Sequence, residues 1–270
     1  MKATLYIIIF IMGTFFGSFA SYAINRIPKK KSITKEESYC EHCKHKLSFI
    51  DMIPVISYLM LGGKCRYCKK KIKSSYFWAE LLMGLISVGI YISIHGIWGT
   101  MSILTLTEYL YLMIFITTIT IVAGIDKNNK IIYKPIIFAG CLLGTVHMIY
   151  LYIINSTTLA SMYKYIVFFA IICILALFTT KYKYFKYRYL LEIMMICIYI
   201  NMFVVSEVFL ITAVLTMIFL LLSIIVKRRK NIIDNSDILA EDDVNLDIPI
   251  AYWLCVSNII AMLIQGIVIM

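Results

Sequence analysis

Long apolar blocks with almost no charged residues are the feature that most constrains this chain. Of its 270 residues, 61% are hydrophobic and 15% are charged, whereas a soluble domain carries about a quarter charged residues. A helix of roughly 20 apolar residues crosses the hydrocarbon core of a bilayer. We expect spans at 4–25, 76–94, 103–125, 136–154, 163–180, 189–206, 208–226 and 249–269. The sequence therefore predicts an all-α polytopic membrane protein with about eight transmembrane helices in the lipid bilayer.

Two of these blocks have an alternative interpretation. The stretch 189–226 is either two spans with a tight turn near Ser206 and Glu207, or one long tilted helix with a re-entrant piece; its length favours two spans. The first block resembles a signal peptide, but Lys2 is its only early basic residue. It is also longer than a typical apolar region of 7–15 residues. We therefore expect a retained first helix over 1–25.

The distribution of basic residues predicts the orientation. Thirteen of the 26 Lys and Arg residues lie between Arg26 and Lys73, and the others cluster in every second loop. The alternate loops at 95–102 and 155–162 and the turn at Ser206 contain no Lys or Arg. Cytoplasmic loops carry the excess of positive charge, so we expect the N-terminus outside and the basic loops in the cytoplasm. The net charge of +11 then serves topology and attraction to anionic lipid headgroups, with no nucleic-acid partner.

The eight cysteines fall into two groups. Four lie singly inside apolar spans, where a free Cys behaves as a small hydrophobic residue. The other four form two C-x2-C pairs separated by 21 residues in the first basic loop; they are Cys40, Cys43, Cys65 and Cys68. Two such pairs complete a tetrahedral thiolate site for structural zinc. A reducing cytoplasm disfavours disulfides. His42 and His45 are alternative ligands, which a complete set of four Cys makes unnecessary. We expect residues 26–75 to form a small zinc-binding cytoplasmic loop domain, followed by a membrane-embedded part at 76–270.

Acidic residues at membrane depth are costly and are usually functional or paired. Asp126 ends the third span at its cytoplasmic edge, and Glu192 lies a few residues inside the sixth span. Glu80 sits one turn into the second span, whereas Glu108 and Glu207 lie near outer ends, where they reach water. By position alone, Asp126 is interpreted as a helix-terminal residue in the polar turn KNNK.

Several of these segments resemble the type IV prepilin peptidases. GSFASYAINRIP near the N-terminus resembles the opening of that family. DMIPVISYLMLGGKCRYC, beginning at Asp51, resembles its D-x-IP and CR-x-C pattern, and IKSSYFWAELLMG resembles its I-x-x-x-YP-x-x-E segment with Phe77 in place of Pro. IPIAYWLCVSNIIAM resembles the segment that opens its last helix. The resemblance implies a bacterial cytoplasmic (inner) membrane location and an aspartyl peptidase in which Asp126 is one catalytic carboxylate.

The second catalytic motif of the family is not matched. The resemblance places a G-x-G-D motif just before the sixth span, but the stretch here is KYKYFKYRYLL, with Lys186 at the position of the Asp. An aspartyl peptidase needs two carboxylates that share a proton. Glu192 lies about 9 Å deeper on a helix and points elsewhere. The last inner loop, on the correct side of the membrane, contains Asp234, Asp237, Asp242, Asp243 and Asp247.

The resemblance implies cleavage of the basic leader of prepilin or pseudopilin precursors at the cytoplasmic face. It also implies methylation of the new N-terminus with S-adenosylmethionine. The missing G-x-G-D motif leaves an alternative open, a non-catalytic member that binds such precursors or assembly partners without cutting them. A transporter is a weaker interpretation, because the spans lack the paired Gly/Pro breaks and midplane charges of a transport site.

Overall fold

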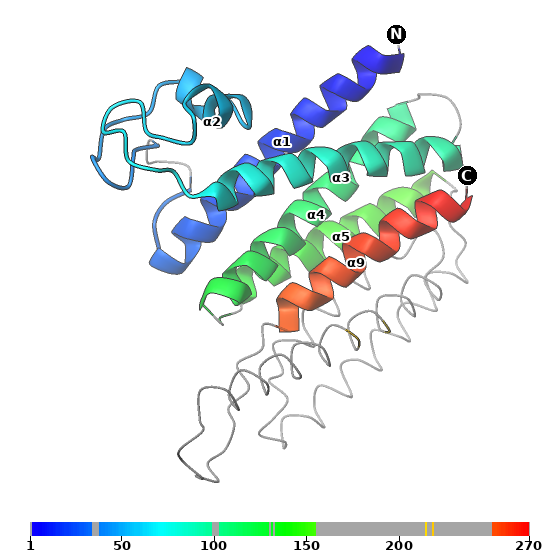
Figure 1. Ribbon diagram of the computed structural model, residues 1–270. Helices are drawn as coiled ribbons and strands as arrows, with labels where there is room; N and C mark the ends of the chain where they lie inside the picture. Colours follow the sequence, from blue (N-terminus) through cyan, green and yellow to red (C-terminus); the bar gives the residue numbers. More distant parts are fainter. Residues whose placement is uncertain are drawn as a thin grey trace, which may run out of the picture. The chain divides into compact units, whose positions relative to one another are not determined.

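The computed structural model describes residues 2–33, 38–98, 103–129, 131, 133–154, 214, 218 and 250–269. Five long helices account for most of them: α1 (Lys2–Arg26), α3 (Ser74–Trp98), α4 (Ile103–Asn129), α5 (Lys134–Ile153) and α9 (Ile250–Ile269) (Figure 1). The short helix α2 (Ile56–Met60) and the 3-10 turns Ile27–Lys29 and Ile50–Met52 belong to the loop between α1 and α3.

Within the described residues, four segments are long and apolar enough to cross a membrane: Ala3–Lys29, Ser74–Ile94, Ile103–Asn129 and Lys134–Ile153. The first four predicted spans are therefore confirmed as helices with nearly the expected bounds. The predicted last span, 249–269, is also helical. The predicted spans 163–180, 189–206 and 208–226 lie outside the described residues, apart from two isolated positions, so the number eight stays a prediction.

The chain divides into two compact units, one made of Met1–Ile121 with Leu263–Met270 and the other of Val122–Met262. The predicted boundaries at residues 25 and 75 do not coincide with this division, because the loop at 26–75 packs in the same unit as the helices on either side of it. The three-part organisation of the sequence stays a prediction, and the two units are described separately below.

In the first unit, α1 and α3 pack side by side (Figure 1). Glycines allow the close approach. A Cβ added at Gly17 would lie 2.8 Å from the Ala79 carbonyl oxygen, and one added at Gly13 would lie 2.4 Å from Ser87 Cβ. Gly13 and Gly17 form a G-x-x-x-G pair, a pattern that brings helix backbones together in membranes. These two glycines therefore allow α1 and α3 to pack closely at this crossing.

A buried hydroxyl contact joins α1, α3 and α4 within the same unit. Ser87 Oγ of α3 donates to the Ile9 carbonyl oxygen at 2.8 Å and lies 2.6 Å from Tyr109 Oη. Ser87 has no exposed surface, and Tyr109 is almost fully buried. Polar side chains that bond between helices stabilise membrane proteins by about 0.6 kcal/mol each, so this contact adds specificity to the apolar packing.

Candidate functional site

The four loop cysteines lie on two copies of the same turn, 25 residues apart in the sequence. In the first copy the Lys44 amide donates to the Cys40 carbonyl oxygen at 3.0 Å, and the Cys40 amide donates to the His45 carbonyl oxygen at 3.0 Å. In the second copy the Lys69 amide donates to the Cys65 carbonyl oxygen at 3.0 Å, and the Cys65 amide donates to the Lys70 carbonyl oxygen at 2.9 Å. Short antiparallel bridges, Tyr39 with Lys46 and Lys64 with Lys71, close the two turns in the same way.

Each turn places its last residue in the left-handed backbone region. Lys44 has φ 59° and Lys69 has φ 58°, where residues with a Cβ are uncommon. This conformation lets the chain reverse directly after the second Cys, so that both thiols of a C-x2-C pair face the same point. The sequence repeats C-x2-C-K in both turns. This repeat contains the two Cys ligands and the Lys that adopts the left-handed conformation.

The four thiols come together as the spacing predicted. The sulfur atoms of Cys40, Cys43, Cys65 and Cys68 all lie within 4.8 Å of one another, and those of Cys40 and Cys68 are 3.9 Å apart. Tetrahedral zinc with Zn–S bonds of 2.3 Å requires sulfurs about 3.8 Å apart. The arrangement can therefore hold a metal ion, with four soft ligands and no open position. Neither His42 nor His45 belongs to the cluster; the His45 ring lies against that of Tyr67.

The thiols differ in how easily they ionise. Burial opposes ionisation of Cys40, but hydrogen bonds from the backbone of Cys43 and His42 lower its pKa to about 7. A hydrogen bond from the His45 backbone favours ionisation of Cys43, whereas burial and the neighbouring thiols raise its pKa to about 11. Metal binding requires thiolates and so releases protons. The Cys40 thiolate therefore forms more readily near neutral pH than that of Cys43.

Asp51 connects the segment before α2 to the second turn. Its carboxylate lies 2.7 Å from Arg66 Nε and 2.7 Å from Ser48 Oγ, and its side chain is only 3% exposed. Burial opposes the charge, but the hydrogen bonds from Ser48 and Arg66 hold the pKa of Asp51 below its usual value. The Asp of the D-x-IP segment and the Arg of CR-x-C therefore form one ion pair in space.

Glu80 ties the loop to α3. Its Oε2 accepts the Val55 amide at 2.7 Å. Val55 has φ 63° and ψ −52°, and the Ile56 amide reaches back to the Pro54 carbonyl oxygen at 2.6 Å. These values describe a γ-turn, which is rare and strained, and the more so at a β-branched residue. The carboxylate holds the turn that begins α2, a structural role that the sequence left open.

Phe77 packs where the family pattern has Pro. Its ring stacks on that of Tyr58 with centroids 5.1 Å apart. Phe77 lies in the first turn of α3 and Tyr58 lies in α2. Stacked aromatic pairs add about 0.5–1.5 kcal/mol beyond the area that they bury. The substitution therefore gives a second contact between the loop and α3, beside that of Glu80.

Asp126 lies in the second unit, near the end of α4, and is 1% exposed. Its Oδ2 accepts the Ala251 amide, in the first turn of α9, at 3.1 Å. The first four amides of a helix lack partners inside the helix, and a negative group is stabilised there by the helix dipole. Lys127 makes a second contact, with its Nζ 4.4 Å from the centre of the Tyr252 ring. Asp126 is thus a cap for α9 as well as a candidate acid.

The other acids considered as a partner for Asp126 lie outside the described residues; they are Glu192, Asp234, Asp237, Asp242, Asp243 and Asp247. The same holds for Lys186. Of the outer acids, Glu108 is 1% exposed, so the expectation that it reaches water was wrong. The sequence did not reveal this because Glu108 lies only one turn and a half from the start of α4, where adjoining helices decide its burial. Glu207 lies outside the described residues.

Comparison with protein families matches residues 11–94 to the bacterial peptidase A24 N-terminal domain. This segment contains the α1–α3 crossing, the four-Cys loop, Asp51 and Glu80. It does not contain Asp126. The match therefore supports the family resemblance for the N-terminal region, where the quoted sequence patterns are densest.

Characterised proteins give the same result. The chain is 40% identical over 95 residues to the prepilin leader peptidase/N-methyltransferase of Vibrio cholerae, covering 32% of this chain and 38% of that protein. The chain is 29% identical over 133 residues to the Aeromonas hydrophila protein of the same name, and this match covers 40% of this chain and 46% of that protein. It is 40% identical over 75 residues to the Bacillus subtilis protein of the same name, and this match covers 28% of this chain and 30% of that protein. The chain spans less than half the length of each of these relatives. No solved structure matches.

Proposed function

We propose that this chain, whose N-terminal region belongs to the bacterial peptidase A24 N-terminal domain family, is a membrane endopeptidase that removes the leader of prepilin-like precursors at the cytoplasmic face. The observation that carries the proposal is the match of residues 11–94 to that family. Relatives named prepilin leader peptidase/N-methyltransferase support the substrate class. The proposed precursors are prepilins or pseudopilins, and the proposed location of the chain is the bacterial cytoplasmic membrane.

Asp126 is the proposed catalytic carboxylate. It is buried, it lies near the end of a membrane-length helix, and its Oδ2 already accepts the Ala251 amide. That hydrogen bond fixes one oxygen of the carboxylate in place. In an aspartyl mechanism the two acids share one proton, so that one activates water as a base while the other protonates the leaving group. The second carboxylate is expected to be Glu192 or one of the acids from Asp234 to Asp247.

The loop cysteines are proposed to hold structural zinc. Four thiolates leave no position for water or substrate, so the metal stabilises the loop and takes no part in bond breaking. The relatives' names also contain N-methyltransferase. We include methylation of the newly exposed N-terminus in the proposal, with S-adenosylmethionine as the methyl donor.

A second candidate function is supported by one specific observation, Lys186 at the position where the family motif has its second Asp. A Lys cannot take the place of a carboxylate in the proton exchange. A member with this change binds prepilin-like precursors or assembly partners without cleaving them.

One experiment separates the two functions. The purified full chain in detergent is incubated with each prepilin-like precursor encoded near it, and the precursor is weighed by mass spectrometry. Release of the leader supports the peptidase, and a further 14 Da on the mature product, about one methylene, reports methylation. Stable binding of intact precursor supports the non-catalytic member. Neither release nor binding for any precursor contradicts both.

The orientation is proposed from charge, with the Cys loop and the Asp126 end of α4 in the cytoplasm. A Cys introduced at Thr100 is expected to react with a membrane-impermeant maleimide added to intact cells, whereas one introduced at Asn129 is expected to be protected. Protection of Thr100 with labelling of Asn129 reverses the topology and removes the cytoplasmic cleavage site.

A further inference from the structure

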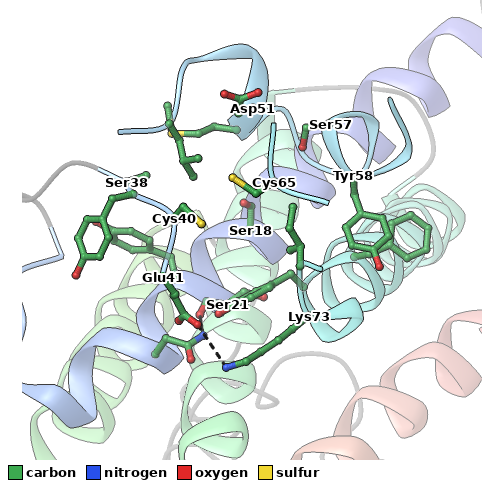
Figure 2. A pocket seen from close by; sticks show the side chains of 18 of the residues that line it. Ser18, Ser21, Ser38, Cys40, Glu41, Asp51, Ser57, Tyr58, Cys65 and Lys73 are labelled. Atoms are coloured by element: carbon green, nitrogen blue, oxygen red, sulfur yellow. Dashed lines mark hydrogen bonds and ion pairs between the residues drawn. The ribbon is translucent and has the colours of Figure 1, made fainter. Parts of the chain in front are cut away.

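A cavity of about 620 Å³ lies between α1, the first turns of α3 and the four-Cys loop, all within the first unit. Ser18 and Ser21 of α1 border it, together with Cys65 and Tyr58 of the loop (Figure 2). Glu41 and Lys73, 3.6 Å apart, also line it. Its volume lies in the range of small-molecule sites. None of the functions proposed above uses this space.

The wall that α1 contributes changes character along the helix. Phe15, Ser18, Phe19, Tyr22, Arg26 and Lys29 line the cavity, at the spacing of three and four residues that makes one helix face. At a rise of 1.5 Å per residue, Phe15 and Lys29 are about 21 Å apart along the axis. Phe15 lies in the middle of the span Ala3–Lys29, and Lys29 is its last residue. This face therefore carries aromatic side chains at membrane depth, with Ser18 among them, and basic side chains at the membrane surface.

Seven of the lining residues are basic and three are acidic: Arg26, Lys29, Lys31, Arg66, Lys70, Lys71 and Lys73 against Glu41, Asp51 and Glu80. The carboxylate of Asp51 is engaged by Arg66, and that of Glu80 by the Val55 amide. Among the described residues, the lining of the cavity therefore carries more basic than acidic side chains. Positive charge at the end of a membrane span attracts anionic lipid headgroups.

Three cations converge on one aromatic ring in this wall. Arg26 Cζ, Lys31 Nζ and Lys44 Nζ lie 5.6, 5.5 and 5.3 Å from the centre of the Tyr39 ring. Lys31 also donates to Tyr39 Oη at 2.8 Å, and Arg26, though buried, donates to the Ser32 carbonyl oxygen at 3.0 Å. Positive charge is therefore concentrated around Tyr39, which lines the cavity. The sequence did not indicate this cluster, because Tyr39 lies 13 residues after Arg26 and 8 residues after Lys31.

We propose that this cavity binds one anionic phospholipid, with its phosphate among Arg26, Lys29 and Lys31 and an acyl chain along Phe19 and Phe15. The graded wall matches a ligand that is negative at one end and apolar at the other. A basic leader peptide has the wrong charge for this wall. S-Adenosylmethionine also has the wrong charge, because its sulfonium and ammonium outweigh its single carboxylate. The bound lipid contacts both the four-Cys loop and α1 and so holds them together. The lipid site does not depend on whether the chain cleaves precursors.

Native mass spectrometry of the delipidated full chain tests the site. Four probes are titrated separately: phosphatidylglycerol, phosphatidylcholine with the same acyl chains, glycerol phosphate and S-adenosylmethionine. We expect one phosphatidylglycerol per protein, bound at least about tenfold more tightly than phosphatidylcholine, and no displacement by either soluble compound. Equal binding of the two lipids overturns the proposal. Displacement by glycerol phosphate means a simple anion site, and displacement by S-adenosylmethionine means a cofactor site; either result also overturns it.

A matched pair of variants distinguishes the cavity from general surface charge. Lys29→Gln with Lys31→Gln removes two lining charges, and Lys30→Gln with Lys64→Gln removes two charges from exposed residues of the same loop outside the cavity. At about 1 kcal/mol per basic residue, the lining variant is expected to weaken phosphatidylglycerol binding roughly 30-fold. The control is expected to bind as the wild type does. Equal weakening in both variants contradicts a defined site, and unchanged zinc content in both shows that the loop has folded.

Discussion

The four-Cys loop and the Asp126 contact with α9 differ in how far along the chain their parts lie. Cys40 and Cys68 are 28 residues apart, and every backbone hydrogen bond that shapes the two turns joins residues within nine positions. Asp126 and Ala251 are 125 residues apart and belong to different helices. The loop is thus built from local turns that one metal can join, whereas the Asp126 site depends on the packing of helices distant in sequence.

This difference explains where family likeness is dense and where it ends. The loop needs particular residues at fixed spacing, so a match over residues 11–94 detects it. A helix-packed site needs few fixed residues, and a backbone amide such as that of Ala251 can be supplied by any residue type. Asp126 therefore lies outside the segment that the family match detects. The predictions below test whether the loop is held by its metal and by its own polar contacts, and whether Asp126 does more than cap α9.

The largest expected effect is loss of the metal. Cys40→Ser combined with Cys65→Ser removes one ligand from each turn, and we expect zinc in the purified full chain to fall from one per protein to near zero. Structural zinc contributes about 10–16 kcal/mol of apparent binding free energy, so the loop should then become sensitive to protease. Zinc is measured by inductively coupled plasma mass spectrometry under reducing conditions.

The control for the metal prediction is the pair of membrane cysteines Cys141 and Cys255. Both lie in helices outside the loop, and their replacement by Ala should leave zinc at one per protein. Full zinc content in the Cys40/Cys65 double variant, or none in the wild type, contradicts a four-thiolate site.

A smaller effect is expected at the α1–α3 crossing. Gly17→Ala places a Cβ 2.8 Å from a backbone carbonyl oxygen of α3 and 2.9 Å from Glu80 Cα, atoms that move only with the helix. Overpacking of this kind costs about 1–3 kcal/mol, so the melting temperature of the full chain in detergent should fall. Gly89→Ala is the matched control, since its new Cβ meets only the end of a Leu263 side chain at 2.8 Å. An equal fall for both variants would show that the crossing is not tight.

The Asp51 ion pair should matter more than the exposed pair beside it. Asp51→Asn removes the charge of a carboxylate that is 3% exposed and accepts two hydrogen bonds of 2.7 Å. Hydrogen bonds to charged groups contribute about 1.5–3 kcal/mol to stability. Glu41→Gln removes the 3.6 Å contact to Lys73, in which the side chains are 50% and 65% exposed, and such pairs contribute about 0–1 kcal/mol. Unfolding of the full chain in denaturant at neutral pH measures both, and equal losses would refute the distinction.

The contribution of Asp51 has a defined pH dependence. Its pKa is lower in the folded protein than in the unfolded chain, so its stabilising effect is fully present above the unfolded value of about 3.9 and is lost as the pH falls through the folded pKa. The stability difference between wild type and Asp51→Asn should therefore be constant from pH 8 to about 5 and shrink only below about 4. A difference that disappears between pH 7 and 5 would contradict this assignment of the pH dependence to Asp51.

The sequence predicted the helices and the metal ligands because both depend on local patterns. Apolar blocks gave the bounds of α1, α3, α4, α5 and α9 to within a few residues, and the C-x2-C spacing selected the four clustered thiols. The burial of Glu108 and the hydrogen bonds of Glu80 and Asp126 could not be predicted in this way, since each depends on which helix or loop packs alongside. The Tyr39 cation cluster was missed for the same reason: its charges come from the end of α1, from Lys31 and from the first cysteine turn.

The central claim is that Asp126 is a catalytic carboxylate, and two substitutions separate this from its capping role. Asp126→Asn keeps an oxygen that accepts the Ala251 amide but removes the titrating group, whereas Asp126→Ala removes both. We expect the melting temperature to be unchanged for Asn and lowered for Ala, by the equivalent of about 0.5–2 kcal/mol for a lost cap. The rate of leader release, measured by mass spectrometry on a cleaved precursor, should fall by at least about a hundredfold for both. Release by Asp126→Asn at the wild-type rate would contradict the claim and leave Asp126 as a cap alone.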